Sequence, residues 1–301
     1  MSDQVNLARN KQSPCLDFDS DLNQGRRTRI MGVLNVTPDS FSDGGEFANH
    51  DIALSHAEKM VEQGADIIDI GGESSRPFSD PVSLEDEISR VLPVIEKLAQ
   101  KITVPISIDT TKSDVAKRAI DAGACIINDI SALRLDPKMA EIAAEAGVPV
   151  IIMHMKGAPK IMQENPQYDD LIGEIKTFLA NAVDTAVKNG ICRSKIIIDP
   201  GIGFGKTFEH NFMILNNLKA FKSIKAPILV GPSRKAFIRD KLKDIAGKDA
   251  APPGPCSQIV ETGTQAAVAA AVLNGADIVR CHDVAETRVT LKIIDAIRKS
   301  C

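Results

Sequence analysis

The chain contains no tryptophan and one tyrosine, and aromatic residues make up 4% of its 301 positions. Proteins that hold single-stranded nucleic acid stack the bases on aromatic side chains, so this composition argues against such a role. Acidic residues outnumber basic ones, 40 to 36, which gives a formal net charge of −4. A nucleic-acid backbone requires a surplus of positive charge. We therefore expect no nucleic-acid partner.

Long hydrophobic runs are also missing. No run approaches the roughly 18 apolar residues that a membrane-spanning helix needs. The segment 1–25 lacks the cationic stretch and apolar core of a secretory signal. We expect a cytoplasmic protein with no membrane contact. The 6 cysteines have no C-x-x-C spacing, which favours small buried residues over metal ligands or disulfides.

Short runs rich in Ile and Val alternate with longer helical patterns. The runs are continuous in hydrophobicity rather than alternating, which is typical of parallel strands buried on both faces. We predict strands at 29–35, 66–71, 104–109, 124–129, 148–154, 195–200, 227–231 and 276–281. Eight alternating units predict an α/β fold of the TIM-barrel type, a (β/α)8 barrel. The alternative is an open, doubly wound sheet.

Local signals mark the ends of the helices. Ser83 precedes an acidic first turn, and Asp283 and Thr111 each open a pattern that resembles a capping box. The pair Asp136-Pro137 indicates an N-cap followed by proline at the first helical position. Five helical patterns end in a glycine just before the next strand, which is the usual C-terminal signal: Gly64, Gly123, Gly147, Gly190 and Gly275.

The domain organisation is simple. We predict one barrel domain over 29–301 and an N-terminal extension over 1–28, within which the segment 5–28 forms a short hairpin that caps the bottom of the barrel. The stretch 244–258 is rich in Pro and Gly and is predicted to be a mobile loop.

A polar or ionisable residue closes every predicted strand. These residues are Asn35, Asp69 with Glu73, Asp109, Asn128 with Asp129, His154, Asp199, Ser233 to Lys235, and Arg280 with His282. The carboxyl ends of the strands form the reactive face of a βα barrel, so we expect these side chains to meet at one mouth. Buried carboxylates there need donors. Lys235, Arg234, Arg280 or the N–H groups of a flat heterocycle could supply them.

Positive charge is concentrated after the last two strands. Arg280 and His282 lie just before the helix that Asp283 caps, which suits a phosphate or a pyrophosphate. The glycine-rich stretch 199–207 is not a P-loop, because Pro200 stands where that motif requires its first glycine. Phe204 in this stretch could lie against a flat ligand. His154 is as consistent with a hydrogen-bonded core histidine as with a ligand.

Eight segments resemble dihydropteroate synthase, in family order and over nearly the whole chain. They are GVLNVTPDSFSDGG (32–45), DIGGESSRP (69–77), SIDT (107–110), IINDI (126–130), MHMKG (153–157), DPGIGFGK (199–206), SRK (233–235) and RCHDV (280–284). The resemblance implies a pterin-binding TIM barrel of folate biosynthesis. Such enzymes condense 6-hydroxymethyl-7,8-dihydropterin pyrophosphate with p-aminobenzoate, release pyrophosphate and use Mg²⁺.

The resemblance also implies roles for individual residues. The pterin ring would be held by Asp109, Asn128, Asp199 and Lys235, with Met153 and Phe204 beside it. The pyrophosphate would be held by Asn35, Arg280 and His282, with Asn35 also reaching Mg²⁺. The p-aminobenzoate site, where sulfonamides compete in this family, would be formed by Phe41, Ser75, Arg76, Pro77 and Ser233. The catalytic residues implied are Lys235, Arg280, Asp43 and Asp109.

Two alternatives and one structural expectation accompany this hypothesis. A methyltetrahydrofolate-dependent methyltransferase shares the pterin barrel but has no need of the anion-binding residues or of the first loop, 35–45. A catalytically silent pterin-binding protein is the second alternative. The resemblance further implies a homodimer. Ser75 departs from the family, which usually has Thr at this position, and Cys281 stands where Val is common.

Overall fold

The computed structural model describes residues 27–37, 46–74, 80–157, 162–246 and 251–300. Within them, parallel strands form one sheet of 8 strands in the order β6-β5-β4-β3-β2-β1-β8-β7. The strands are β1 (Arg29–Asn35), β2 (Ile67–Gly71), β3 (Ile106–Asp109), β4 (Ile126–Asp129), β5 (Val150–Met153), β6 (Ile196–Asp199), β7 (Leu229–Val230) and β8 (Ile278–Cys281). The predicted N-terminal hairpin lies outside the described residues.

The barrel closes between β6 and β7. Ile198 and Ile228 form a parallel bridge there, and the backbone N–H of Ile198 donates to the carbonyl of Pro227 at 2.9 Å. The prediction of a (β/α)8 barrel is therefore confirmed, and the open doubly wound sheet was the wrong alternative.

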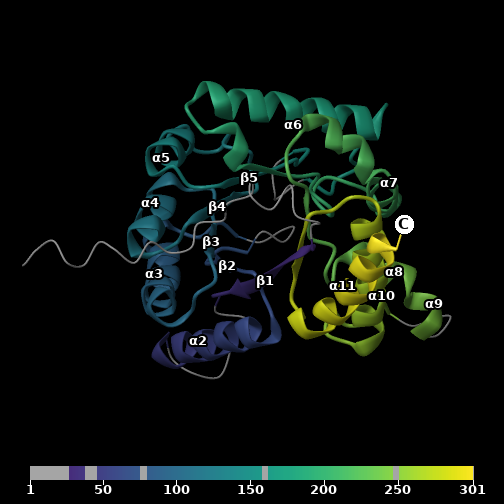
Figure 1. Ribbon diagram of the computed structural model, residues 1–301, viewed down its shortest axis with the longest axis horizontal. Helices are drawn as coiled ribbons and strands as arrows, with labels where there is room; N and C mark the ends of the chain where they lie inside the picture. Colours follow the sequence, from purple (N-terminus) through teal and green to yellow (C-terminus); the bar gives the residue numbers. More distant parts are fainter. Residues whose placement is uncertain (1–26, 38–45, 75–79, 158–161, 247–250, 301) are drawn as a thin grey trace, which may run out of the picture.

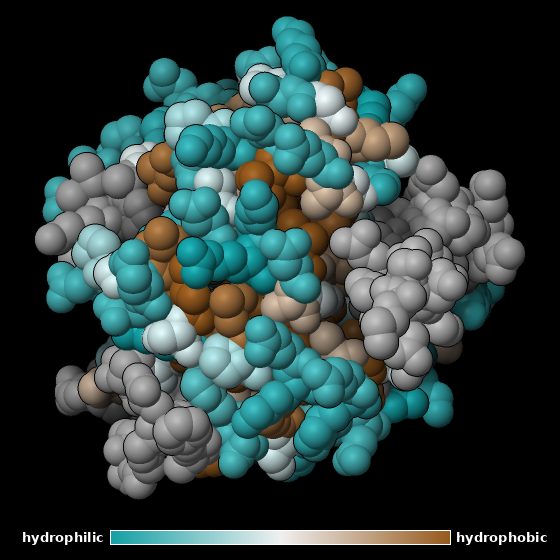
Figure 2. Space-filling view, turned by 90° about the vertical axis from the view of Figure 1, so that its left-hand side faces the viewer, coloured by the Kyte–Doolittle hydropathy of each residue, from teal (hydrophilic) through white to brown (hydrophobic). Residues whose placement is uncertain are grey.

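Helices surround the barrel (Figure 1). They are α2 (Glu46–Gln63), α3 (Leu84–Lys101), α4 (Ser113–Ala122), α5 (Met139–Ala146), α6 (Leu171–Lys188), α7 (Phe208–Asn216), α8 (Ala236–Lys241), α9 (Lys243–Ala246), α10 (Gln258–Leu273) and α11 (Val284–Lys299), with 3-10 turns at Arg193–Lys195 and Leu218–Ile224. Helices α2 to α5 cover one side, which Figure 2 shows as a mainly hydrophilic surface with hydrophobic residues visible in between. None of the described helices is long and apolar enough to cross a membrane.

Two separate apolar cores follow from the alternation of side chains along each strand. The larger core lies between strands and helices and includes Ile68, Ile108, Ile127 and Ile198. The smaller one takes residues from seven strands and fills the barrel interior: Met31, Ile67, Ile126, Ile151, Ile197, Leu229 and Ile278, together with Cys125. Each strand is thus buried on both faces, which is why its sequence is continuously hydrophobic.

The predicted helix ends are partly confirmed. All five glycines named above have positive φ, between 62° and 122°, and the side chains of Ser83 and Asp283 accept N–H groups of α3 and α11. The caps at Thr111 and Asp136 were wrong. Lys112 occupies the N-cap position of α4 and its side chain makes no cap. Asp136 instead accepts the N–H of Ser113, at the start of α4, at 2.8 Å and that of Lys138, just before α5, at 3.0 Å. It thus bridges two successive βα units.

The stretch 244–258 also differs in part from its prediction. Residues 243–246 form the short helix α9, and α10 begins at Gln258. Between them, the carbonyl of Pro253 accepts from Arg239 Nε of α8 at 2.9 Å, while 247–250 lie outside the described residues. Of the cysteines, Cys125 and Cys281 are buried as predicted, whereas Cys192 and Cys256 are exposed.

Candidate active site

The polar strand ends face the barrel mouth because of their spacing from the interior core. Side chains two positions apart on a strand point to the same side. Ile67 is followed by Asp69, Ile126 by Asn128, Ile197 by Asp199 and Ile278 by Arg280. On these four strands the interior apolar layer therefore carries a polar residue directly above it, at the carboxyl end of the strand.

Arg280 joins three strands at this mouth. Its Nε donates to Asp69 Oδ2 at 2.6 Å and its Nη2 to Asp109 Oδ2 at 2.7 Å. Asn128 Nδ2 donates to the same Asp69 oxygen at 3.0 Å. Asp69 is fully buried, and its other oxygen, Oδ1, has no hydrogen-bond partner among the described residues. A buried carboxylate of this kind is stable only with a charged partner, which Arg280 supplies.

The charges of this group depend on each other. Burial raises the pKa of Asp109 to about 7, although the Arg280 guanidinium acts in the opposite direction. Burial also opposes the charge of Arg280, but Asp69 and Asp109 outweigh it and raise the pKa of the guanidinium above its usual value. The mouth thus holds a permanent cation beside a carboxyl group that titrates near neutral pH.

Lys235 and Asp199 form the other half of the mouth. Lys235 Nζ donates to the carbonyl of Ile202 and lies 4.7 Å from the centre of the Phe204 ring. Burial lowers the pKa of Lys235 to about 8, while Asp199 opposes this shift. Asp199 Oδ1 accepts the N–H of Gly201 at 2.7 Å, and burial raises the pKa of its carboxyl. Phe204 packs against a cluster that contains Met153, Met155 and Met162.

Residues predicted to hold an anion lie at the same end. His282 follows β8, and its Nδ1 is 3.0 Å from Ser233 Oγ. Asn35 ends β1 and is half-buried beside Gly71 of β2. The structure therefore places the described members of the predicted set at the carboxyl ends of the strands or in the turns that follow them: Asn35, Asp109, Asn128, Met153, Asp199, Phe204, Ser233, Lys235, Arg280 and His282.

Comparison with known proteins agrees with this geometry. Residues 31–282 match the family described as pterin binding enzyme. The chain is 46% identical to dihydropteroate synthase of Synechocystis over 91% of each chain, and 43% identical to that of Escherichia coli over 89% of this chain and 90% of the other. A solved structure, the Yersinia pestis dihydropteroate synthase with a sulfonamide drug complex, superposes with a TM-score of 0.83 at 44% identity, covering 91% of this chain and 95% of that one.

The chain belongs to the dihydropteroate synthase family. It is a transferase of folate biosynthesis, which transfers a pterinylmethyl group to p-aminobenzoate. The leading hypothesis is therefore confirmed over the methyltransferase and over the silent pterin-binding protein. A solved family member from Xanthomonas albilineans contains 4-aminobenzoic acid, with 40% identity and a TM-score of 0.81 over 91% of this chain and 94% of that one.

Two residues that were considered as donors or ligands lie elsewhere. Arg234 does not reach Asp109 or Asp199. It has a left-handed φ of 59°, and its Nε lies 3.5 Å from Glu261 of α10, so its side chain diverges from that of its neighbour Lys235. His154 is 5% exposed and its Nδ1 is 2.9 Å from Lys206 Nζ. It is a hydrogen-bonded core histidine.

Two residues at or near the site have roles that the sequence alone did not predict. The sequence marks Asp69 only as a polar strand end, although its side chain holds Arg280. It places Lys206 only in the glycine-rich stretch that is not a P-loop, although this lysine is buried behind the site. Its position at the end of DPGIGFGK was the available signal, but a lysine next to a glycine-rich turn is more often exposed.

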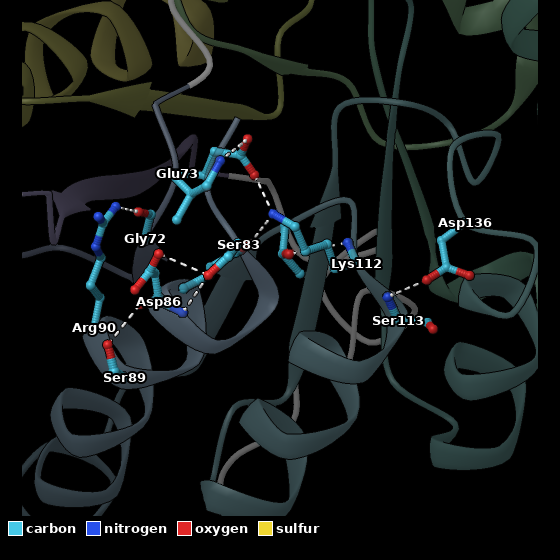
Figure 3. Close-up of polar contacts among 12 residues, drawn as sticks. Gly72, Glu73, Ser83, Asp86, Ser89, Arg90, Lys112, Ser113 and Asp136 are labelled. Atoms are coloured by element: carbon cyan, nitrogen blue, oxygen red, sulfur yellow. Dashed lines mark hydrogen bonds and ion pairs between the residues drawn. The ribbon is translucent and has the colours of Figure 1, made fainter. Parts of the chain in front are cut away.

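An ion-pair network joins the chain after β2 to the start of α3 and α4 (Figure 3). Lys112 Nζ lies 2.5 Å from Glu73 and 2.5 Å from the fully buried Glu87. The other oxygen of Glu73 accepts the N–H of Val82 at 3.2 Å, and Arg90 donates to the carbonyl of Gly72 at 2.8 Å. The network therefore connects the two sides of the segment 75–79. Phe41, Asp43, Ser75, Arg76 and Pro77 lie outside the described residues.

Proposed function

We propose that the polar layer of the mouth binds the pterin ring and that Arg280, His282 and Asn35 bind the diphosphate of the same substrate. The observation that carries this proposal is the convergence of Asp109, Asp199 and Arg280 from three separate strands, with Lys235 beside them. Carboxylates accept the ring and amino N–H groups of an aminopyrimidinone, and the amide of Asn128 can both donate and accept. Arg280 Nη1 has no hydrogen-bond partner among the described residues, which leaves one N–H edge for a phosphate oxygen.

The reaction requires little covalent chemistry from the protein. The C–O bond at the methylene group breaks, its electron pair leaves with the pyrophosphate, and positive charge on the methylene carbon spreads into the electron-rich ring. The neutral arylamine nitrogen then forms the new C–N bond and loses a proton. The tasks of the protein are to stabilise the leaving anion, through Arg280 and His282, and to exclude water from the cation. No Ser or Cys nucleophile is needed.

The donor set fits Mg²⁺ bound mainly by the substrate. No group of three His, Cys, Asp or Glu side chains within the described ranges could hold a metal ion. Mg²⁺ commonly takes one or two protein oxygens together with phosphate oxygens and waters. The half-buried Asn35 has no side-chain hydrogen bond among the described residues, so its amide oxygen is the residue that would hold the ion. When bound, Mg²⁺ would neutralise charge on the leaving pyrophosphate.

A coupled assay of pyrophosphate release, with and without p-aminobenzoate, tests these roles. We expect Lys235→Ala and Asp109→Ala each to lower turnover by at least ~100-fold while the protein remains folded. Lys219→Ala and Asp184→Ala serve as matched controls, because both residues are exposed and lie on segments that lead into the amino ends of β7 and β6, opposite the mouth. Near-normal turnover in either site variant would remove the proposed assignment.

Three further properties are part of the proposal. We expect a homodimer, which sedimentation tests. The support is a set of exposed apolar residues on the last two helices: Leu273, Val289, Ile293 and Ile297.

We expect sulfonamides to compete with p-aminobenzoate, which competition kinetics test. The support is the sulfonamide complex of the Yersinia pestis relative. We expect a cytoplasmic location, tested by cell fractionation.

A further inference from the structure

A second buried lysine lies next to the mouth. Lys206 is 2% exposed, and no carboxylate forms a salt bridge with it in the part of the chain that the structure describes. Its Nζ lies 2.8 Å from the carbonyl of Phe204, 3.3 Å from the carbonyl of His154 and 2.9 Å from His154 Nδ1. The amine therefore connects the glycine-rich turn after β6 to the end of β5.

The turn presses closely against that strand end. Gly201 and Gly205 have φ values of 73° and 64°, in the left-handed region that favours glycine. A Cβ atom on Gly201 would lie 1.9 Å from the carbonyl oxygen of His154, and one on Gly205 would lie 2.3 Å from that of Lys156. Lys206 bonds the same His154 carbonyl, so its amine stabilises the turn at the point of closest approach.

In the position in which Lys206 holds it, the turn supports two residues that we propose bind the substrate, Lys235 and Asp199. Its Ile202 carbonyl accepts from Lys235 Nζ, and its Phe204 ring lies under the same ammonium. Its Gly201 N–H donates to Asp199. A shift of the turn would therefore displace Lys235 and weaken the hydrogen bond that orients Asp199.

A lysine is a costly choice for this position if stability alone matters. Burial of an amine removes its hydration, and an apolar side chain of similar volume often stabilises a protein better. Burial lowers the pKa of Lys206 well below its usual value, with Asp199 opposing the shift, as expected for a desolvated amine. Its three polar contacts all go to the segment that supports the pterin ligands or to the strand end beneath it.

We propose that Lys206 is a positioning residue for the pterin-diphosphate substrate, acting through the turn 201–205 on Lys235 and Asp199. The inference rests on the proposed roles of those two residues in binding the pterin ring.

The test is Lys206→Met, which keeps an unbranched apolar stem of four heavy atoms but removes the amine. Pyrophosphate release is measured while each substrate is varied, and thermal unfolding is measured on the same samples. We expect KM for the dihydropterin pyrophosphate to rise by ~10-fold or more, KM for p-aminobenzoate to stay within ~2-fold, and the unfolding temperature not to fall. A purely structural lysine would instead lower the unfolding temperature without separating the two KM values.

Lys195→Met is the matched control. Lys195 precedes β6 at its opposite end, where its Nζ donates to the carbonyl of Gly147, so it is also a lysine that bonds a backbone carbonyl. We expect both KM values of this variant to match those of the unchanged protein. Lys206→Gln retains N–H donors on a shorter side chain. Its KM for the pterin substrate should lie between that of the unchanged protein and that of Lys206→Met.

Several outcomes would overturn the inference. They are an unchanged pterin KM in Lys206→Met, equal changes in both KM values, and failure of both Lys206 variants to fold, which would make the amine a folding requirement. If Lys235→Ala is inactive while Lys206→Met keeps the kinetics of the unchanged protein, only the inference about Lys206 is overturned and the proposed pterin site stands. An unaffected Lys235→Ala overturns the proposed pterin site itself.

Discussion

Two layers of the barrel interior differ in polarity although they are two residues apart on the same strands. The lower layer is filled and apolar apart from Ser107, whose buried hydroxyl has no hydrogen-bond partner among the described residues. The upper layer carries a charged or amide group on five strands, with Val33 and Met153 on two others, and one buried oxygen of Asp69 has no partner among the described residues. The lower layer removes apolar surface from water and so supports the fold. The upper layer keeps incompletely bonded groups in place, which a polar ligand can complete.

Replacement of Arg280 should have the largest effect. Arg280→Met removes the cation from Asp69 and Asp109, so we expect turnover to fall by at least ~1000-fold and the free energy of unfolding to fall by about 3 kcal/mol. Pyrophosphate release and urea denaturation measure the two effects. A stable variant with high turnover would show that the upper layer does not depend on this guanidinium.

A change in the lower layer should separate stability from binding. Ile197→Ala removes a fully buried side chain from the layer below Asp199, and we expect a loss of about 2–5 kcal/mol in the free energy of unfolding. Both KM values should stay within ~2-fold, since the ligands above remain. A large change in KM with little loss of stability would contradict the division between the layers.

The Lys112 network offers a third case, which is charged and lies beside the polar layer without belonging to it: its member Glu87 acts on the charge of Asp109 but bonds none of the layer's side chains. Lys112→Met leaves the fully buried Glu87 without its cation, and we expect a loss of about 2 kcal/mol in the free energy of unfolding. KM for the pterin substrate should not change. Urea denaturation measures the free energy of unfolding, and substrate kinetics measure KM. A selective rise in KM for the pterin substrate would mean that this network contributes to substrate binding at the mouth.

The pH dependence of kcat/KM should show the smallest effect. We expect kcat/KM to change by about tenfold for each pH unit below the acid pKa or above the basic pKa of the upper layer. The pKa of Asp109 is raised to about 7, so its carboxylate is lost as pH falls below that value. The pKa of Lys235 is lowered to about 8, so its charge is lost as pH rises above it. We expect kcat/KM for the pterin substrate to be bell-shaped, and Asp109→Asn to lack the acid limb. A flat profile from about pH 6 to pH 9 would exclude these assignments.

Particular residues show where prediction from sequence succeeded. Ser83 and Asp283 were correctly predicted as helix caps because a cap and the N–H it accepts lie three residues apart in the sequence. Asp136 was misassigned because one of its partners, Ser113, belongs to the preceding unit. Arg234 and Lys235 are adjacent and equally charged, but Arg234 has a left-handed backbone and lies near Glu261, whereas Lys235 bonds the turn at the mouth.

The sequence by itself determined the strands, the glycine-terminated helices and the polar residue that follows each strand, because these depend on local spacing and on burial of both strand faces. Only the tertiary structure decided which of these polar residues pair. Arg280 bonds Asp69 across 211 positions of the chain, and Lys206 bonds His154 across 52. Such partners meet only when the barrel closes, and their charges then depend on each other at low dielectric, which no local pattern encodes.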